Sequence, residues 1–229
     1  MFATAQPSDV SDHAMDILRE ADLVDLHVDG MIPHRLVGYD LNRRHERAPL
    51  AGRFFGHLDF PRAMENGLAG AMWSITTHPF RTAASRWKVF LANLDRLHQL
   101  AADSNGQLQV ATDAAGYREA RARGAHVVLP AIQGGNALEG APNGVSSIPG
   151  NAITRVTLVH LTDSCFGTTS SPLRLGADRG LGPRGHDLVE QLDACRVFVD
   201  LAHISRPAFY EAVEAHDPSL PLIVTHTGV

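Results

Sequence analysis

Short apolar runs alternate along the chain with stretches in which apolar residues recur every three or four positions. The runs contain β-branched residues and indicate strands that are buried on both faces, since such strands need no polar alternation. The amphipathic stretches indicate helices that each bury one face. Predicted strands cover 21–28, 68–76, 125–135, 153–160, 197–203 and 220–226, with a shorter strand-like piece at 108–113.

Predicted helices separate most of these strands, at Ser8–Ala21, Thr82–Ala102, 114–124, Asp187–Arg196 and a segment that begins after Ser205. Ser8 or Ser11 can cap the first helix and Ser205 the last. Strand–helix alternation predicts a parallel α/β sheet, either open and doubly wound or closed as a (β/α)8 barrel of the TIM type. The sequence HVDGMIPH after the first strand contains no glycine-rich phosphate loop, which disfavours a nucleotide-binding open sheet.

The stretch Ile32–Leu58 is rich in Arg, His, Pro and Gly and has no clean period. It is predicted to be a long loop, and loops of this length in a compact domain are often functional. In a barrel such a loop covers the rim at the carboxyl ends of the strands, so we expect it to shape a substrate pocket.

Composition narrows the class of protein. The 229 residues are 44% hydrophobic and 20% charged, which suits one globular domain over residues 1–229. The net charge of −5 gives no reason to expect a nucleic acid or an anionic membrane as partner, and a homo-oligomer stays open. Two cysteines form no disulfide framework. No signal peptide or apolar membrane span is recognisable, so the expected location is cytoplasmic.

Polar side chains collect where the predicted strands end. His27 and Asp29 end the first strand, Gln133 the strand at 125–135, and one histidine ends each of the last three. The carboxyl ends of parallel barrel strands share one rim, where active sites are built. Imidazoles and a carboxylate together suit Zn²⁺. These three histidines are His160, His203 and His226.

Any one histidine at a strand end is more often a structural residue with satisfied hydrogen bonds. The joint pattern favours a metal, because several imidazoles and an aspartate buried together without one would leave polar groups unpaired. The remaining histidines fall in helices, loops or strand starts and are expected at the surface. They include His13, His45, His98, His126, His186 and His216.

An ordered set of motifs spans the chain from about Asp25 to His226. It consists of HxD on the first strand, then HLDFPRAMENGLAGAMWSI, IQGGNAL, VTLVHLTDSC, GLGPRGHDLVEQLDACRVFVDLAHIS and LIVTH. HxD alone is common among metal-dependent amidohydrolases, but the ordered set resembles the renal (membrane) dipeptidase family. That resemblance implies a zinc-dependent barrel that cleaves dipeptides, including dipeptides with a D-residue at the second position.

The resemblance also implies roles for single residues. His27 and Asp29 would bind one zinc ion, and His203 and His226 a second. His160 matches the family's non-ligand histidine, which contacts the substrate or the tetrahedral intermediate. Gln133 stands where the family has a bridging glutamate, since IEGG is IQGG here. An amide keeps an oxygen ligand but lacks the negative charge, so one metal would be lost or held more weakly.

The second departure concerns the end of the chain. About six barrel strands are recognisable, and the family's last two strands, which carry an assisting aspartate, find no counterpart. We therefore expect an incomplete barrel whose C-terminal part is missing. The leading hypothesis is a metallodipeptidase that acts on a small dipeptide-like substrate with one or two Zn²⁺ ions. The alternatives are a single-metal hydrolase of another amide or ester, and an inactive relative or fragment.

Overall fold

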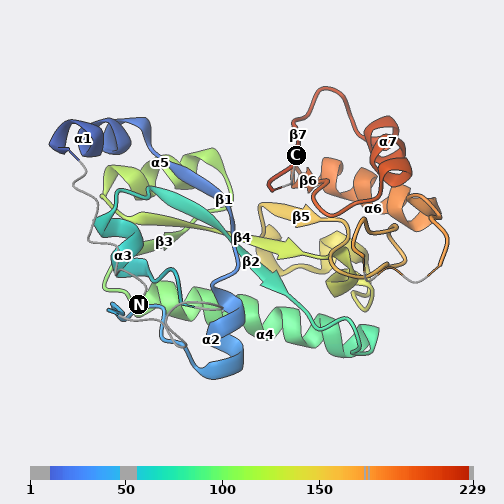
Figure 1. The fold of residues 1–229 in the computed structure, drawn as a ribbon, viewed down its shortest axis with the longest axis horizontal. Coiled ribbons are helices and arrows are strands. Elements are labelled where there is room, and N and C mark those ends of the chain that lie inside the picture. Colours follow the sequence, from blue (N-terminus) through green and yellow to red (C-terminus); the bar gives the residue numbers. More distant parts are fainter. Residues whose placement is uncertain (1–10, 47–55, 173, 175, 227–229) are drawn as a thin grey trace, which may run out of the picture.

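The computed structural model describes residues 11–46, 56–172, 174 and 176–226. Its centre is a parallel sheet in the order β1-β2-β4-β5-β6-β7, with the short β3 also paired to β4 (Figure 1). The parallel α/β class predicted from the sequence is confirmed. The strands are β1 Val24–Val28, β2 Gly70–Thr76, β3 Leu108–Val110, β4 His126–Gln133, β5 Arg155–Thr157, β6 Phe198–Asp200 and β7 Leu222–Ile223.

The sheet curls as part of a barrel does. β1 and β7 are not hydrogen-bonded neighbours, yet the ring of His27 in β1 stacks on the ring of His226, which follows β7, with 3.9 Å between their centroids. An open flat sheet would hold its first and last strands far apart, because neighbouring strands are about 4.8 Å apart. The curl therefore brings the carboxyl ends of distant strands around a shared centre.

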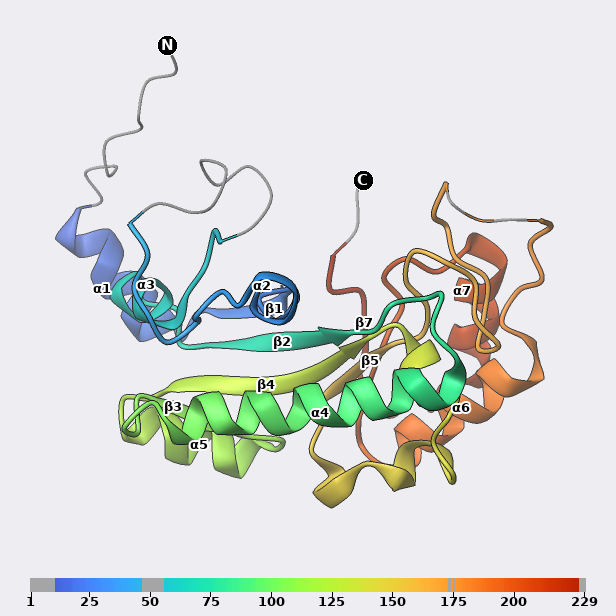
Figure 2. The same ribbon diagram turned by 90° about the horizontal axis from the view of Figure 1, so that it is seen from below.

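Seven α-helices accompany the strands in the described part of the chain. Figure 2 shows α4 and α5 beneath β2 and β4, with α2 on the opposite side of these strands. No helix in this part combines the length and apolar character that crossing a membrane requires. The helices are α1 Asp12–Ala21, α2 Met31–Val37, α3 Phe60–Glu65, α4 Ala83–Ala102, α5 Ala114–Ala122, α6 Gly182–Ala194 and α7 Arg206–Ala215.

Side-chain caps fix several helix starts. Ser11 accepts a hydrogen bond from Ala14 N, and Ser205 accepts one from Ala208 N, so both predicted caps are confirmed. Ser8, the alternative cap of the first helix, lies outside the described residues. Pro207 falls in the first turn of α7, where a missing N–H costs nothing.

Pro130 lies in the middle of β4, although proline lacks the N–H that a central strand normally donates. One edge of β4 pairs with β2, and the other pairs first with β3 and then with β5. Val128 O accepts from Ala111 N just after β3, and Pro130 O accepts from Thr154 N just before β5. The missing N–H of Pro130 therefore falls where β4 passes from one neighbour to the next.

The two faces of the strands differ in chemistry. Val156 and Val199 point into the largest apolar cluster, which also contains side chains of α4, α6 and α7. Their neighbours in the strands, Arg155 and Asp200, are fully buried on the other face. The outer face of the sheet thus forms the apolar core, while its inner face is lined with polar groups.

Three expectations from the sequence need correction. The stretch Ile32–Leu58 is not wholly a loop, because α2 occupies Met31–Val37, while residues 47–55 lie outside the described part. The helix expected at Asp187–Arg196 begins earlier, at Gly182, since Pro183 is accommodated in its first turn. The strand expected at 220–226 is paired only over Leu222–Ile223.

Two histidines expected at the surface are buried. His126 is 1% exposed and His216 is 8% exposed. Trp73 Nε1 donates to His126 Nε2 at 3.2 Å, so the proton of this neutral ring lies on Nδ1, which donates to Leu68 O at 2.9 Å. His126 is therefore a structural residue with both nitrogens satisfied.

Candidate functional site

The six residues singled out from the sequence all lie near the carboxyl ends of the strands. His27 lies within β1 with Asp29 just after it, and Gln133 is the last residue of β4. The other three histidines do not end their strands as expected. Each lies three residues beyond one, since β5, β6 and β7 end at 157, 200 and 223 and the histidines are His160, His203 and His226.

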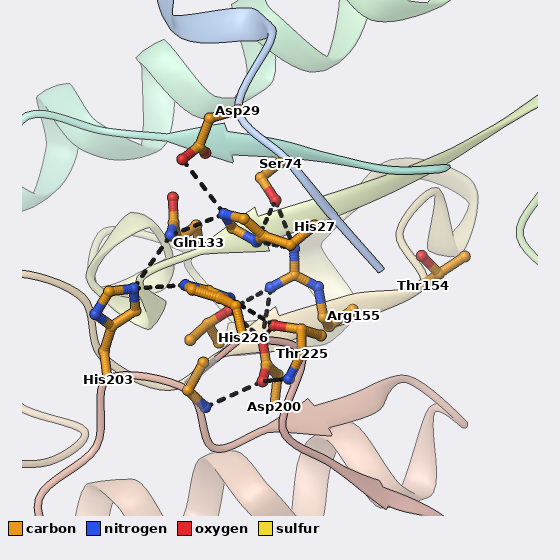
Figure 3. Close-up of polar contacts among 12 residues, drawn as sticks. His27, Asp29, Ser74, Gln133, Thr154, Arg155, Asp200, His203, Thr225 and His226 are labelled. Atoms are coloured by element: carbon orange, nitrogen blue, oxygen red, sulfur yellow. Dashed lines mark hydrogen bonds and ion pairs between the residues drawn. The ribbon is translucent and has the colours of Figure 1, made fainter. Parts of the chain in front are cut away.

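Five of these side chains converge on one point of the barrel interior (Figure 3). Gln133 Nε2 is 3.2 Å from His27 Nε2 and 3.4 Å from His203 Nε2. His226 Nε2 is 2.7 Å from His203 Nε2, and Asp29 Oδ2 is 3.3 Å from His27 Nε2. The predicted convergence is therefore present, with the amide of Gln133 between the imidazoles of His27 and His203.

His160 lies at the edge of this group. Its ring packs edge-on against His203, with 4.8 Å between centroids, and it makes no hydrogen bond to any of the five side chains. The absence of a side chain at Gly134 lets His160 pack against the backbone there. A Cβ at position 134 would lie 3.3 Å from His160 Cβ and 3.0 Å from Asn136 Oδ1. Gly134 also has φ +95, a conformation that favours glycine.

A buried ion pair lies beneath the imidazoles. Arg155 Nη1 is 2.7 Å from Asp200 Oδ2, and neither side chain has exposed surface. Arg155 Nη2 donates to Ser74 Oγ at 2.5 Å, and Ser74 Oγ lies 3.2 Å from His27 Nδ1. Burial alone would raise the pKa of Asp200, but Arg155 and hydrogen bonds from Thr157, Ala202 and Thr225 hold this pKa below its usual value.

Thr225 connects this pair to His226. Its hydroxyl donates to Asp200 Oδ2 at 2.8 Å, and the same oxygen lies 2.9 Å from His226 Nδ1. Because a hydroxyl has one hydrogen and the ionised carboxylate can only accept, the oxygen of Thr225 accepts from His226 Nδ1–H. Nε2 of His226 therefore carries a lone pair, which faces His203 Nε2 at 2.7 Å in the centre of the cluster.

His203 has an unusual backbone. Its φ is +65, in the left-handed region that residues other than glycine seldom adopt. Its carbonyl oxygen accepts hydrogen bonds from Ser170 N at 2.7 Å and Ser170 Oγ at 3.0 Å, and Thr169 Oγ1 lies within hydrogen-bonding distance of both this oxygen and His160 O. The loop after β5 thus holds a strained residue in place, and such strain is concentrated at functional sites.

Burial and neighbouring rings favour the neutral form of three of these imidazoles. Burial, followed by the nearby rings of His27 and His203, lowers the pKa of His226 to about 4. Burial and then the neighbouring His203 lower the pKa of His160 to about 4. Burial and then His27 also lower the pKa of His203. Neutral imidazoles have the free lone pair that metal binding requires.

The chemistry of the donor set fits a metal ion. Two buried oxygens at the site, Asp29 Oδ1 and Gln133 Oε1, lack a hydrogen-bond partner among the described residues. Unpaired buried oxygens beside imidazole nitrogens are an environment that a cation would satisfy. The spacing is closed, however, since no group of three or more His, Cys, Asp or Glu side chains in the described ranges encloses a metal position as it stands. The Gln133 amide and the direct His203–His226 contact take up that space.

The supporting network was not identified from the sequence. This network lies beneath the histidines, and none of its members is a strand-end histidine. Its members are Ser74, Arg155, Asp200 and Thr225. A signal was present, because Ser74 and Asp200 are polar residues flanked by apolar ones, and Arg155 is a charged residue, inside strands predicted to be buried on both faces. A polar residue at such a position must find a partner, and here it finds one across the barrel interior.

Similar solved structures share this fold at low sequence identity. A metallo peptidase from Rhodobacter sphaeroides, liganded with a phosphinate mimic of the dipeptide L-Ala-D-Ala, is 23% identical with a TM-score of 0.70, covering 90% of this chain and 64% of that one. The probable dipeptidase PvdM from Pseudomonas aeruginosa is 16% identical with a TM-score of 0.72, covering 94% and 55%. The dipeptidase AC, a metallo peptidase of family M19, is 23% identical with a TM-score of 0.71, covering 90% and 62%.

Sequence comparison adds a relative and a family. An uncharacterized protein in the PQQ-III 3′ region of Acinetobacter calcoaceticus is 22% identical over 197 residues, which are 77% of this chain. The chain spans about 62% of that relative's length. The family model for membrane dipeptidase, peptidase family M19, matches residues 11–229. The chain therefore belongs to the membrane dipeptidase family, peptidase family M19.

Proposed function

We propose that this chain is the metal-binding part of a zinc-dependent dipeptidase that hydrolyses the peptide bond of a small dipeptide. The observation that carries the proposal is the convergence of the Nε2 atoms of His27, His203 and His226 beside Asp29. Neutral imidazoles and one carboxylate are the donors that zinc prefers. The relatives named as dipeptidases and metallo peptidases support the same reaction.

His27, Asp29, His203 and His226 are the proposed ligands. A bound zinc ion would supply a Lewis acid that polarises the peptide carbonyl and acidifies the attacking water. The protein's own part is to hold the ligands in the required tautomer. Thr225 does this for His226 by accepting its Nδ1–H. Arg155 Nη2 and Ser74 Oγ orient the ring of His27, since they lie 3.3 Å and 3.2 Å from its Nδ1.

We assign His160 to the substrate. It lies against His203 without joining the hydrogen bonds of the cluster, so its ring stays available to a molecule at the rim. As a neutral ring it offers one N–H donor. In peptide hydrolysis that donor would stabilise the negative charge that develops on the carbonyl oxygen.

Gln133 supports a second candidate, a single-metal hydrolase of another amide or ester. An amide oxygen can bind one cation but carries no negative charge to hold two together. Its nitrogen also faces the imidazoles of both His27 and His203 in this structure. The number of bound metal ions separates the two candidates, since the dipeptidase hypothesis allows two and this one allows one.

The test measures metal content and turnover of a dipeptide panel, with zinc added to the purified chain. We expect bound zinc and hydrolysis, and His203→Ala should abolish hydrolysis and lower zinc content. His98→Ala is the matched control, because His98 lies exposed on α4 away from the cluster. If zinc content and turnover are equal in the two variants, the proposed site is wrong. Zinc binding without turnover of any dipeptide would favour the second candidate.

A further inference from the structure

Arg35 on α2 is a cation without a counter-charge among the residues that the structure describes. Its side chain is partly buried, and it makes no ion pair with any residue in the described part of the chain. One guanidinium N–H group, at Nη1, donates to the carbonyl oxygen of Thr76 at the end of β2. The segments outside the described ranges contain a single acidic side chain, that of Asp9. The remaining N–H groups of this guanidinium therefore have no acidic acceptor among the described residues.

Arg35 lines a cavity of about 150 Å³ at the same rim as the histidine cluster. His160 lines it too, and the ring of His160 packs against His203. Thr76 is the register partner of Gln133 in the neighbouring strand, so the cavity lies one strand away from the centre of the cluster. Its other polar walls come from Thr77, His78, Asn136 and Thr162.

The electrostatics of the cavity favour an anion. Burial, followed by the nearby positive charge of Arg81, lowers the pKa of Arg35. An arginine stays protonated under such a shift, so the shift measures how far its surroundings disfavour the charge. An anion that enters the cavity would relieve both effects. A planar guanidinium also matches a carboxylate with two parallel hydrogen bonds.

We propose that this cavity is a subsite for a carboxylate group of the substrate, with Arg35 as the residue that recognises it. The inference rests on the proposed function, because it assigns the cavity to a molecule that also reaches the histidine cluster through His160. Two sources supply the same chemistry: the terminal carboxylate of a dipeptide and the carboxylate of an acidic side chain. In both cases Arg35 fixes which end of the substrate lies beside His160.

Binding can be tested separately from catalysis. The probes are N-acetylalanine and its uncharged amide, measured by calorimetry on protein stripped of metal by chelation and desalting. We expect the acid to bind more tightly than the amide. Arg35→Gln should weaken binding of the acid about 10- to 100-fold, as expected when a charge-assisted hydrogen bond is lost, and leave the amide unaffected. Arg35→Lys should restore part of the loss.

Arg123→Gln is the matched control, since Arg123 is exposed and pairs with Glu119 on α5. It should leave both affinities unchanged. Circular dichroism of each variant verifies folding, and the Lys variant keeps the test valid if the Gln variant does not fold. Equal binding of acid and amide by the unaltered protein would overturn the proposal, as would an unchanged preference in Arg35→Gln.

Dipeptide substrates then identify the source of the carboxylate. Alanyl-alanine carries only the terminal carboxylate, and alanyl-glutamate with its terminal carboxylate converted to an amide carries only the side-chain carboxylate. If Arg35→Gln raises the KM for alanyl-alanine, the subsite binds the terminal carboxylate. If it raises the KM for the alanyl-glutamate amide, the subsite binds the side-chain carboxylate. If the acid probe binds through Arg35 but zinc-loaded protein hydrolyses no dipeptide, the carboxylate site stands and the proposed function fails. If the zinc-loaded protein hydrolyses dipeptides and this hydrolysis does not depend on Arg35, the proposed function stands and the carboxylate site fails.

Discussion

Thr225 Oγ1 lies 2.8 Å from Asp200 Oδ2, and this contact joins the base of the barrel interior to the histidine cluster above it. Since Asp200 is fully buried and can only accept, it fixes the direction of the Thr225 hydroxyl. That direction in turn fixes which nitrogen of His226 keeps its proton. A residue far from the solvent thereby determines whether His226 presents a lone pair at the site.

Thr225→Val removes this connection and retains the shape of the side chain. We expect zinc affinity to fall about 10- to 100-fold, as for other partners that orient metal-binding histidines. The measurement is competition between the protein and a zinc chelator of known affinity. Thr157→Val is the control, because Thr157 also donates to Asp200 Oδ2, at 2.6 Å, but makes no hydrogen bond to a histidine among the described residues. Equal losses of zinc affinity in the two variants would show that the effect comes from the hydrogen bonds to Asp200 and not from the contact between Thr225 and His226.

Arg155→Met tests the buried ion pair itself. Asp200 would remain buried without its cation, and breaking such a pair from one side costs about 3–5 kcal/mol of folding free energy. Chemical denaturation measures this loss, which we expect Arg155→Met/Asp200→Leu to reduce. The exposed pair of Arg123 and Glu119 provides the comparison, since Arg123→Met should cost less than about 1 kcal/mol. Similar losses of folding free energy at the two sites would mean that burial does not make an ion pair more important for stability.

The parts of this fold that follow from local pattern could be predicted. Apolar runs and amphipathic spacing located every strand and most helices, because each depends on residues near in sequence. Helices α2 and α3 were missed, since they span only Met31–Val37 and Phe60–Glu65 and each contains a proline. A segment that short shows no full amphipathic period.

The candidate site could be predicted in part for a related reason. Strand ends meet at one rim in any parallel barrel, so the histidines could be grouped without knowing a single contact. The pairing of Arg155 with Asp200 could not, because it joins residues 45 positions apart whose contact exists only after β5 and β6 pair. Arg35 was likewise hidden within a presumed loop, and its isolation from acidic groups is a property of the folded chain.

Asp59 should make stability depend on pH in the acid range. Its carboxylate is fully buried and accepts hydrogen bonds from Arg62 N at 2.9 Å and His45 N at 3.0 Å, with Arg62 Nε at 2.7 Å. Burial alone would raise its pKa, but these bonds and the charge of Arg62 lower it below the ordinary 3.8. A carboxyl whose pKa is lower in the folded state stabilises the protein above the unfolded pKa, and this contribution is lost as pH falls through the folded value.

Asp59→Asn should therefore lower the free energy of unfolding at pH 7 by about 1–3 kcal/mol, and the difference from the unaltered chain should shrink below about pH 4. Urea denaturation across a pH series measures this. Asp113→Asn is the control, because Asp113 caps α5 through Gly116 N but forms no ion pair within the described part of the chain. Asparagine is an equally good cap, so the control should change stability by less than about 0.5 kcal/mol. A pH-independent difference for Asp59→Asn would mean that its charge is not what stabilises α3.

Gln133→Glu should raise the zinc content per chain towards two. The amide nitrogen now lies 3.2 Å from His27 Nε2 and 3.4 Å from His203 Nε2, while its oxygen has no hydrogen-bond partner in the described structure. A carboxylate at this position would face both imidazoles with an acceptor and a negative charge, which lets two cations approach without repelling each other as strongly.

Without metal the same variant should be less stable, since an added buried charge has no counter-ion. Elemental analysis of both proteins and thermal unfolding with and without zinc measure the two effects. Equal zinc content in the two proteins would show that residue 133 does not limit metal binding, and would move the cause of any second-site loss to residues elsewhere at the rim.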